Sequence, residues 1–330
     1  EADLADALDR LASSPAAAPL DHAALGPRLS ELFWQTPALA DWLADASLQK
    51  LVWCPRVGEP AFTCLDAAGA IGGTLAGYGA VVFASATLGP PEIFSEANGL
   101  TAPPAVIRAA APWRDGAYDV AIDTRVDTTF QHRSRHYPAT AATIAALQAG
   151  ARGPVAVFFP SYVYAEAVRQ ALDATDATLR VALQPRLPDL AAQAAWIEES
   201  LLLADALFLV LGSSFTESID LLGGRVTQAM VVGPALPEVN AVQRARLAAL
   251  ERAGLTREQA FRRVYQIPGM QKVNQALGRL VRAPGQRTRV ILHCRRFADP
   301  GYAALLAPEY QHGELIATEA DLSAWLGHDA

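Results

Sequence analysis

The stretch Gln271-Lys-Val-Asn-Gln-Ala-Leu-Gly-Arg-Leu-Val-Arg282 has the residue pattern of an amphipathic helix. Val273, Leu277 and Leu280 follow the i, i+4, i+7 spacing that places apolar side chains on one helix face. The run Ala-Pro-Gly at 283–285 is typical of a helix end, because proline cannot continue a helix. The spacing therefore predicts one helix over 271–282 that packs through this apolar face.

The opposite face of this predicted helix carries an amide and two guanidiniums, from Gln275, Arg279 and Arg282. Gly278, beside Arg279, has no side chain and lets a ligand approach closely. A fork of fixed positive charges suits a phosphate group that gains negative charge during phosphoryl transfer. An ordinary solvated helix face has the same pattern, so periodicity by itself leaves both interpretations open.

The composition is that of a soluble globular protein with room for two compact units. The chain has 330 residues, of which 52% are hydrophobic and 18% are charged. It contains neither a run of about 18 uncharged apolar residues, which a membrane span would need, nor a secretory signal. The net charge of −7 argues against a generally basic nucleic-acid-binding surface. A local basic surface is predicted, because residues 261–296 contain nine Lys or Arg and no Asp or Glu.

Several phosphate-binding and metal-binding signatures are absent from the sequence. The chain nowhere contains Gly-Lys, so it has no Walker A loop, and it has no Asp-Glu-x-His box. The three cysteines, Cys54, Cys64 and Cys294, are too few for a four-cysteine iron–sulfur site and are interpreted as reduced cytosolic thiols. Any ATPase activity would therefore need phosphate-binding residues from another polypeptide segment.

The string Gln275-x-x-Gly278-Arg279-x-x-Arg282 resembles the last conserved motif of superfamily 2 helicases. The longer run from Tyr265 to Tyr302, which includes Arg296-Phe297, resembles the DinG/XPD family of DNA helicases more narrowly. In that family the two arginines act as arginine fingers and the glutamine senses the γ-phosphate. Other stretches of the chain match the same family in the expected order.

Ser85-Ala-Thr87 resembles helicase motif III, which couples the state of ATP to the grip on DNA. It follows an apolar run at 80–83 that is predicted to be a buried strand. The resemblance assigns Ser85 and Thr87 to ATP coupling. A plain turn at a strand end is the alternative, since tripeptides recur by chance.

Phe-Phe-Pro-Ser-Tyr at 158–162 resembles motif IV, where a loop meets a DNA phosphate. It follows a predicted strand at 155–159, and Ser161 and Tyr162 lie where a helix begins. Free backbone N–H groups at a helix N-terminus attract phosphate. Ser161 could equally cap the helix, and both roles are compatible.

A mixed cationic and aromatic segment at 130–137 contains Arg133, which could contact a nucleic-acid backbone. A solvated loop before a helix starting near Pro138 is the alternative interpretation of this segment.

The segment 212–220 after a predicted strand at 206–211 resembles motif V, which faces both nucleotide and DNA. The resemblance makes Asp220 a contact to ribose or to the arginines. It assigns Glu217 to holding the loop and Ser214 to DNA contact. Both carboxylates could instead satisfy backbone N–H groups at a helix start.

The sequence departs from the family pattern at three positions. Thr216 stands where the family has tryptophan, and Ser218 stands where it has glycine, which tolerates backbone conformations that serine resists. Cys294 stands where the family usually has aspartate. These departures motivate an alternative, a helicase-like module that binds nucleic acid or protein and has lost its motor activity. An unrelated α/β nucleotide-binding enzyme would need a Gly-rich strand-to-helix turn, which the sequence lacks.

Residues 1–50 or so read as helices, and 51–54 and 61–64 as short strands. From about residue 115, strands alternate with helices, which predicts an α/β fold with a parallel sheet covered on both faces. The resemblance makes residues 111–330 a RecA-like helicase motor domain 2. It makes residues 1–110 a mainly helical arch remnant with residual strands of motor domain 1.

The resemblance implies the C-terminal half of an ATP-dependent DNA helicase of 5′ to 3′ polarity. ATP and Mg²⁺ would be bound mainly by a preceding half that carries the Walker A loop, and any iron–sulfur cluster would lie there too. The expected partners are single-stranded DNA and the N-terminal motor domain of the same protein, with no membrane. The expected location is the bacterial cytoplasm, at the nucleoid. Without the preceding half, we expect this chain to be inactive as an ATPase.

Overall fold

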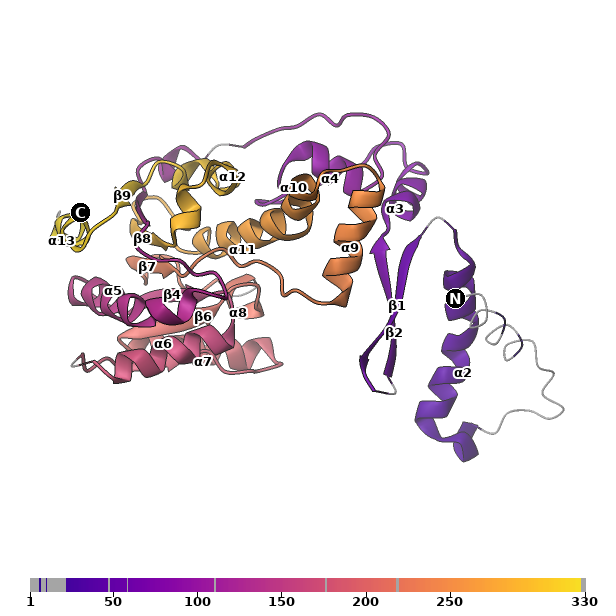
Figure 1. Cartoon of the computed structure of the whole chain (residues 1–330), viewed down its shortest axis with the longest axis horizontal. Helices are drawn as coiled ribbons and strands as arrows, with labels where there is room; N and C mark the ends of the chain where they lie inside the picture. Colours follow the sequence, from indigo (N-terminus) through magenta and orange to yellow (C-terminus); the bar gives the residue numbers. More distant parts are fainter. Residues whose placement is uncertain are drawn as a thin grey trace. The chain divides into compact units, whose positions relative to one another are not determined.

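The computed structural model describes residues 6, 10, 22–46, 48–57, 59–109, 111–175, 177–217 and 220–327. These residues form two compact units, whose elements are drawn in Figure 1. The first unit draws on residues 1–84, 90–106 and 239–257. The second unit draws on residues 85–89, 107–238 and 258–330.

The first unit combines helices with one antiparallel hairpin. Its strands β1 (Gln49–Arg56) and β2 (Glu59–Asp66) pair with Val52 opposite Phe62, which confirms the two predicted strands. The Trp53 indole N–H donates a hydrogen bond to Thr63 Oγ1 across the hairpin over 3.0 Å. The helices are α2 (His22–Ala44), α3 (Ala68–Leu75), α4 (Pro91–Ala97) and α9 (Ala241–Arg252). The helical prediction for residues 1–50 is confirmed over α2, whereas most of residues 1–21 lie outside the described ranges.

The apolar run at 80–83 is not a strand, so this sequence prediction is wrong. Val82 is 88% exposed. A strand is stable only when neighbouring strands pair with its backbone groups. Among the described residues before Tyr118, the strands are β1 and β2, and they pair with each other. The run therefore has no partner strand here, and its hydrophobicity does not lead to burial.

The second unit is built on a seven-stranded sheet with the order β5-β6-β4-β7-β8-β3-β9. All the pairings between neighbouring strands are parallel. The strands are β3 (Tyr118–Asp123), β4 (Val155–Phe159), β5 (Val181–Leu183), β6 (Ala206–Val210), β7 (Gln228–Val231), β8 (Thr288–His293) and β9 (Glu314–Ile316). Because the strands are parallel, all their carboxyl ends meet at one edge of the sheet, the usual ligand-binding edge of α/β folds.

Helices cover both faces of this sheet, which confirms the predicted α/β architecture. Val157 and Phe159 of β4 point into one core with α5 (Tyr137–Ala149), α6 (Tyr162–Asp173) and α13 (Glu319–Gly327). Ala156 and Phe158 point into the other core with α7 (Leu190–Leu203), α11 (Ile267–Leu277) and α12 (Pro300–Ala303). This alternation follows from the two-residue period of a strand. Shorter helical turns are η1 (Pro112–Arg114), η2 (Arg133–His136), α8 (Ser214–Glu217), η4 (Arg295–Ala298) and η5 (Pro308–Tyr310).

The helix predicted over 271–282 is shorter than expected at its C-terminal end. α11 follows α10 (Arg257–Phe261) and the π-helical turn η3 (Arg262–Gln266), and it ends at Leu277 with Gly278 as its cap. The backbone then continues in tight turns, because the Arg279 N–H bonds to the Ala276 carbonyl and the Leu280 N–H to the Leu277 carbonyl. Arg279 and Arg282 therefore lie on a turn rather than on a helix face. The predicted apolar face is confirmed, since Val273, Leu277 and Leu280 are fully buried.

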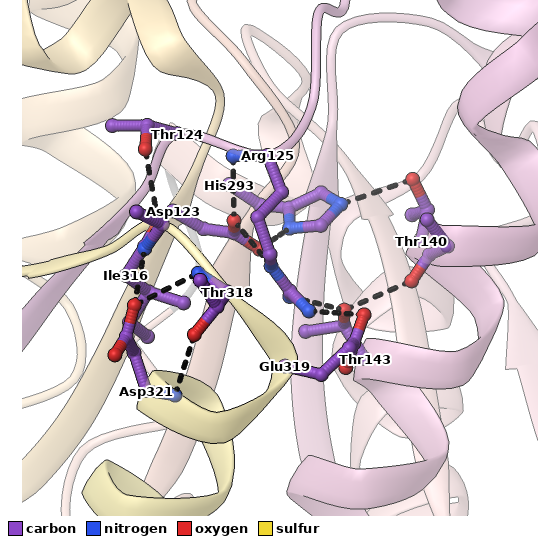
Figure 2. A network of polar contacts seen from close by, with 12 residues as sticks. Asp123, Thr124, Arg125, Thr140, Thr143, His293, Ile316, Thr318, Glu319 and Asp321 are labelled. Carbon is purple, nitrogen blue, oxygen red and sulfur yellow. Dashed lines mark hydrogen bonds and ion pairs between the residues drawn. The ribbon is translucent and has the colours of Figure 1, made fainter.

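A polar network is buried where β3, β8 and α5 meet, as Figure 2 shows. His293 places Nδ1 2.7 Å from Asp123 Oδ2 and Nε2 3.0 Å from Thr140 Oγ1. Arg125 donates from Nε and Nη2 to the same Asp123 carboxylate over 2.9 and 2.7 Å. The Asp123 and His293 side chains are completely buried. Because a buried charge must be paired, this network locks the carboxyl ends of β3 and β8 onto α5.

Candidate functional site

The two predicted arginine fingers meet the loop that follows β6. Arg282 Nη2 lies 2.6 Å from Asp220 Oδ2, and Arg279 Nη1 lies 3.9 Å from Asp220 Oδ1. The three side chains are partly exposed, at 25% for Arg279, 48% for Arg282 and 39% for Asp220. The fold thus brings together residues that are far apart in sequence and leaves both guanidiniums open to solvent.

Close packing between the two loops holds these side chains together. Gly224 has a φ of +71°, and a Cβ added there would lie 2.4 Å from the Gln286 amide nitrogen. Its N–H donates to the Leu280 carbonyl over 3.3 Å. Gln286 Oε1 accepts in turn from the Arg282 N–H over 2.7 Å. A side chain at position 224 would be strained by the positive φ and would displace the Gln286 side chain, which accepts from the turn that carries the arginines.

Arg114 and Tyr118 fix the turn after α11, and sequence reasoning did not find either residue. The Tyr118 hydroxyl donates to the Leu277 carbonyl over 3.0 Å. Arg114 donates from Nη2 to the carbonyls of Gly278 and Val281, each over 3.3 Å. These donors take up carbonyl groups that a longer helix would use internally, which explains why α11 stops at Leu277. No local sequence pattern predicts these hydrogen bonds, because they join residues about 160 positions apart.

Gln275 and the Ser-Ala-Thr segment also lie along α11. Gln275 is partly buried on the last turn of the helix. The Thr87 N–H donates to Ser85 Oγ over 3.2 Å, which is a local hydroxyl turn. Gln271 Nε2 donates to the Thr87 carbonyl over 3.0 Å, so α11 holds this segment directly. The ATP-coupling role assigned to Ser85 and Thr87 stays a prediction.

The predicted DNA-contacting residues Ser161 and Tyr162 lie at the start of α6. Ser161 Oγ accepts from the Tyr164 N–H over 3.3 Å, which confirms the helix-capping role. The Tyr162 hydroxyl accepts from Gln184 Nε2 over 2.6 Å, and Gln184 Oε1 accepts from the Val210 N–H over 2.7 Å. This buried glutamine therefore ties the start of α6 to the end of β6. The sequence analysis did not identify Gln184. A polar residue directly after the short apolar strand β5 is the pattern that could have indicated it.

The loop after β6 has its hydroxyl groups engaged inside the protein. Ser214 Oγ donates to Gln193 Oε1 over 2.6 Å. Thr216 is 1% exposed and donates to the Ser213 carbonyl over 3.0 Å. Thr216 thus fills an internal position where the family has tryptophan. The predicted coupling residue Glu217 ends α8, but its side chain lies outside the described part of the structure, as does all of Ser218.

Arg133 is positioned by two aromatic rings. Its guanidinium lies 4.7 Å from the Phe130 ring centre and 5.2 Å from that of Tyr164. Stacking of this kind holds an arginine in place while its charge is kept. A DNA contact of Arg133 stays a prediction.

Cys294 is fully buried and takes part in a hydrogen-bonded chain. The Thr128 hydroxyl donates to Cys294 Sγ over 3.1 Å, and Arg296 Nη2 donates to Thr128 Oγ1 over 3.0 Å. Arg296 also lies over the Tyr302 ring, at 5.8 Å from its centre. Arg296 is therefore held in place although Cys294 stands where the resembled family usually has aspartate.

The described residues offer no candidate metal centre and no candidate membrane span. They contain no group of three or more His, Cys, Asp or Glu side chains that could hold a metal ion. Among the same residues, no helix has both the length and the hydropathy needed to cross a bilayer. Cys54 is exposed, Cys64 is half-buried and Cys294 is buried.

Comparisons with solved structures support the fold. An XPD helicase structure superposes with a TM-score of 0.66 at 15% identity, covering 92% of this chain and 56% of that one. A structure described as apo XPD superposes with a TM-score of 0.63 at 14% identity, covering 95% of this chain and 62% of that one. At these identities the likeness shows the fold, and this chain spans less than two thirds of either XPD chain.

Sequence comparison supplies the family. A search of curated protein sequences finds no match. The family model described as the helicase C-terminal domain matches residues 144–313, the range that includes β4, the loop after β6 and the turn with the arginines. Family and fold together confirm the predicted resemblance to the C-terminal portion of a DinG/XPD-type helicase. The chain therefore belongs to the helicase C-terminal domain family.

Proposed function

We propose that this chain is the C-terminal motor domain of an ATP-driven DNA helicase and supplies its arginine fingers. The observation that supports this most is the contact of Asp220 with Arg279 and Arg282. This contact joins the loop after β6, which begins at the carboxyl edge of the sheet, to two partly exposed guanidiniums. A carboxylate that orients arginines in solvent preorganises them for an incoming anion.

The side chains at this site fit the terminal phosphates of ATP. Guanidiniums donate paired N–H groups that match phosphate oxygens. Arg279 and Arg282 would stabilise the negative charge that grows on the transferred phosphoryl group, and Gln275, on the last turn of α11, would contact the γ-phosphate. Asp220 would release or retain the arginines according to whether phosphate is present. The groups that bind Mg²⁺ belong, in this proposal, to the motor domain with the Walker A loop.

The proposed DNA grip lies along the carboxyl edge of the same sheet. The N–H groups in the first turn of α6 have no carbonyl partner within the helix, and Ser161 Oγ caps that of Tyr164. These groups and Ser161 would bind a phosphate of the single strand. Tyr162, Ser214 and Arg133 would line the same path. We further propose 5′ to 3′ movement, with the N-terminal motor domain of the same protein as partner and the bacterial nucleoid as the place of work.

ATP hydrolysis tests this proposal directly. The measurement uses the protein extended upstream through its Walker A loop, with and without single-stranded DNA. We expect DNA-stimulated turnover that Arg279→Ala lowers by about 10³- to 10⁵-fold, the range known for arginine fingers. The matched control is Arg287→Ala, which removes an exposed arginine from the segment between α11 and β8. The control should leave turnover unchanged.

Two results would contradict the proposal. Turnover by the 330-residue chain on its own, abolished by Arg279→Ala, would show that the chain needs no Walker A partner. No turnover by the extended protein, with DNA binding retained, would favour a binding module that has lost its motor. Thr216, Ser218 and Cys294, which depart from the family pattern, are the residues that motivate this alternative.

A further inference from the structure

A cavity of about 250 Å³ lies beyond the carboxyl ends of β3 and β8, away from the two arginines discussed above. All of its lining residues except Val126 have polar or charged side chains. The charged and titratable members are Arg125, Asp127, His132, Arg135, His136 and Arg295. These side chains favour a ligand with charge and hydrogen-bonding groups, because buried polar groups need partners.

Asp127 organises the cationic side of this cavity. Its carboxylate is 8% exposed and lies 2.7 Å from Arg295 Nη2 and 2.9 Å from His132 Nδ1. Burial by itself would raise the pKa of Asp127, but hydrogen bonds from Thr129 and His132 outweigh burial and lower it. The carboxylate is therefore ionised at neutral pH and holds Arg295 and His132 beside the opening.

One guanidinium around the cavity has no ion-pair partner among the described residues. Arg125 is paired with Asp123 and Glu319, and Arg295 is paired with Asp127. Arg135 is exposed and forms no ion pair with any residue that the structure describes. The charges of this group balance, but Arg135 has no carboxylate to accept from its N–H groups. A phosphodiester carries a negative charge and oxygens that accept hydrogen bonds, so it can pair with Arg135.

The cavity continues the edge on which the proposed DNA grip lies. In the sheet order, β4, which leads to Ser161, is followed by β7, β8 and β3. Three steps of about 4.8 Å between neighbouring strands put the ends of β4 and β3 about 14 Å apart. An extended single strand that contacts Ser161 would reach this cavity within a few nucleotides.

An exposed aromatic ring belongs to the chain segment that lines the cavity. Phe130 is 81% exposed, although it lies between Asp127 and His132, which both belong to the site. Arg133 supports its ring from one side, at 4.7 Å from the ring centre. Single-strand-binding proteins combine such a ring, on which a base stacks, with a cationic groove for the backbone.

We propose that this cavity binds one phosphodiester group of the single strand through Arg135 and Arg295, while Phe130 stacks on a neighbouring base. The proposal rests on the DNA-binding function inferred above and adds a second contact to it. It assigns roles to Arg135, Arg295 and Phe130, to which neither the family match nor the motif comparison gives a role.

The salt dependence of oligonucleotide binding tests the phosphate contact. Binding of a fluorescent oligo-dT by the 330-residue chain is measured at several salt concentrations. Loss of one phosphate contact to a single strand should lower the slope of log K against log salt by about 0.7. We expect this for Arg135→Ala. The matched control is Arg152→Ala, which removes another exposed arginine from the loop before β4, at the amino edge of the sheet. The control should keep the wild-type slope.

The stacking contact should respond differently to salt. Phe130→Ala should weaken oligo-dT binding by about 5- to 150-fold, the value of one stacked base, without changing the slope. A ring that stacks on a base releases no counterion. Phe130→Trp should restore the affinity, because it offers a larger π-face, and this rescue separates stacking from a general loss of structure.

The outcomes distinguish this proposal from the proposed function. If the wild-type chain binds oligo-dT and Arg135→Ala binds it with the wild-type affinity and slope, the cavity is not on the DNA path and only this inference fails. If Arg135→Ala abolishes binding of inorganic phosphate in equilibrium dialysis but leaves the oligo-dT slope intact, the cavity is a free-phosphate site and the proposal is again overturned. If the wild-type chain binds no oligo-dT, the proposed DNA grip fails along with it.

Discussion

Asp123 and Asp220 each hold arginine side chains beside the same parallel sheet, but their surroundings differ. Asp123 is completely buried, and Arg125 beside it is 11% exposed. Asp220 is 39% exposed, and its partners Arg279 and Arg282 are 25% and 48% exposed. In the buried cluster the carboxylate is bonded by Arg125 and His293, and the imidazole by Thr140 as well. In the exposed cluster, solvent can replace either partner.

The difference in burial separates a structural cluster from one that can bind a ligand. A buried charge that loses its partner stays in a medium of low polarity, so exchange of partners is costly. An exposed ion pair is screened by water and contributes little to stability. The guanidiniums at Asp220 can therefore exchange a carboxylate for a phosphate at small cost, whereas Arg125 cannot. The same residue types are thus held fixed in the buried cluster and can exchange partners in the exposed one.

The largest expected difference between the two clusters comes from removing each carboxylate in turn. Asp123→Ala leaves Arg125 and His293 without their buried partner, and we expect it to lower the free energy of unfolding by about 3–5 kcal/mol. Asp220→Ala should lower it by less than about 1 kcal/mol, because its pairs are exposed. Urea denaturation followed by circular dichroism measures both. Equal losses for the two variants would show that burial does not distinguish the clusters.

Acid should lower the stabilisation that the buried cluster contributes to folding. The loss should be smaller than the loss caused by removal of the Asp123 side chain. Burial would raise the pKa of Asp123, but hydrogen bonds from Arg125 and His293 outweigh burial and hold its pKa well below the usual value. The unfolded chain therefore takes up this proton first, near the ordinary pKa of about 3.9. The stabilisation is fully present above about pH 4 and is lost as the pH falls further.

The measurement is the urea midpoint of wild type and Asp123→Asn as the pH falls from neutral through about pH 4. The variant has no carboxyl group at this position, so its stability should decline less steeply with acid. Parallel declines would mean that Asp123 does not account for the acid sensitivity. Other aspartates with a lowered pKa, such as Asp127 and Asp205, remain in both proteins and cancel in the difference.

Within the buried cluster, loss of one hydroxyl group should cost less than loss of the Asp123 carboxylate. Thr140→Val keeps the shape of the side chain but removes the hydroxyl group 3.0 Å from His293 Nε2. A buried ring nitrogen without a partner costs about 1–3 kcal/mol. Thr143→Val, whose hydroxyl accepts from Arg125 Nη2 over 3.0 Å, is a neighbouring comparison on the same helix. A loss below about 0.5 kcal/mol for Thr140→Val would indicate that water replaces the hydroxyl.

Prediction from sequence worked best for features that depend on residues within one helix or strand. The strand at 155–159 is apolar throughout because it is buried on both faces, and that pattern is visible without a structure. A helix cap is one of the two roles that the sequence leaves open for Ser161, and its Oγ does cap α6. The apolar face of Val273, Leu277 and Leu280 was also visible, since helical spacing shows it directly.

Prediction failed where a distant residue decides a local outcome. The helix over 271–282 looked continuous, but Arg114 and Tyr118 take up the carbonyls beyond Leu277 and end it. The run at 80–83 looked like a strand, but no strand in the described part of the chain pairs with it. The sequence showed the cationic and aromatic segment at 130–137, but not the cavity, because Arg295 joins its lining from the segment after β8, a distant part of the chain.

The order of strands and helices, the apolar faces and the family motifs were readable from the sequence, because they depend on residues close together in the chain. The motif comparison left Asp220 a contact to ribose or to the arginines, and the tertiary structure places it against Arg279 and Arg282. The burial of Asp123 with His293 and the cavity at Arg135 were decided by tertiary structure. These features depend on which strand ends become neighbours and on how much water reaches them. Periodicity records which face of an element is apolar, but it does not record which charged residue another element brings next to it.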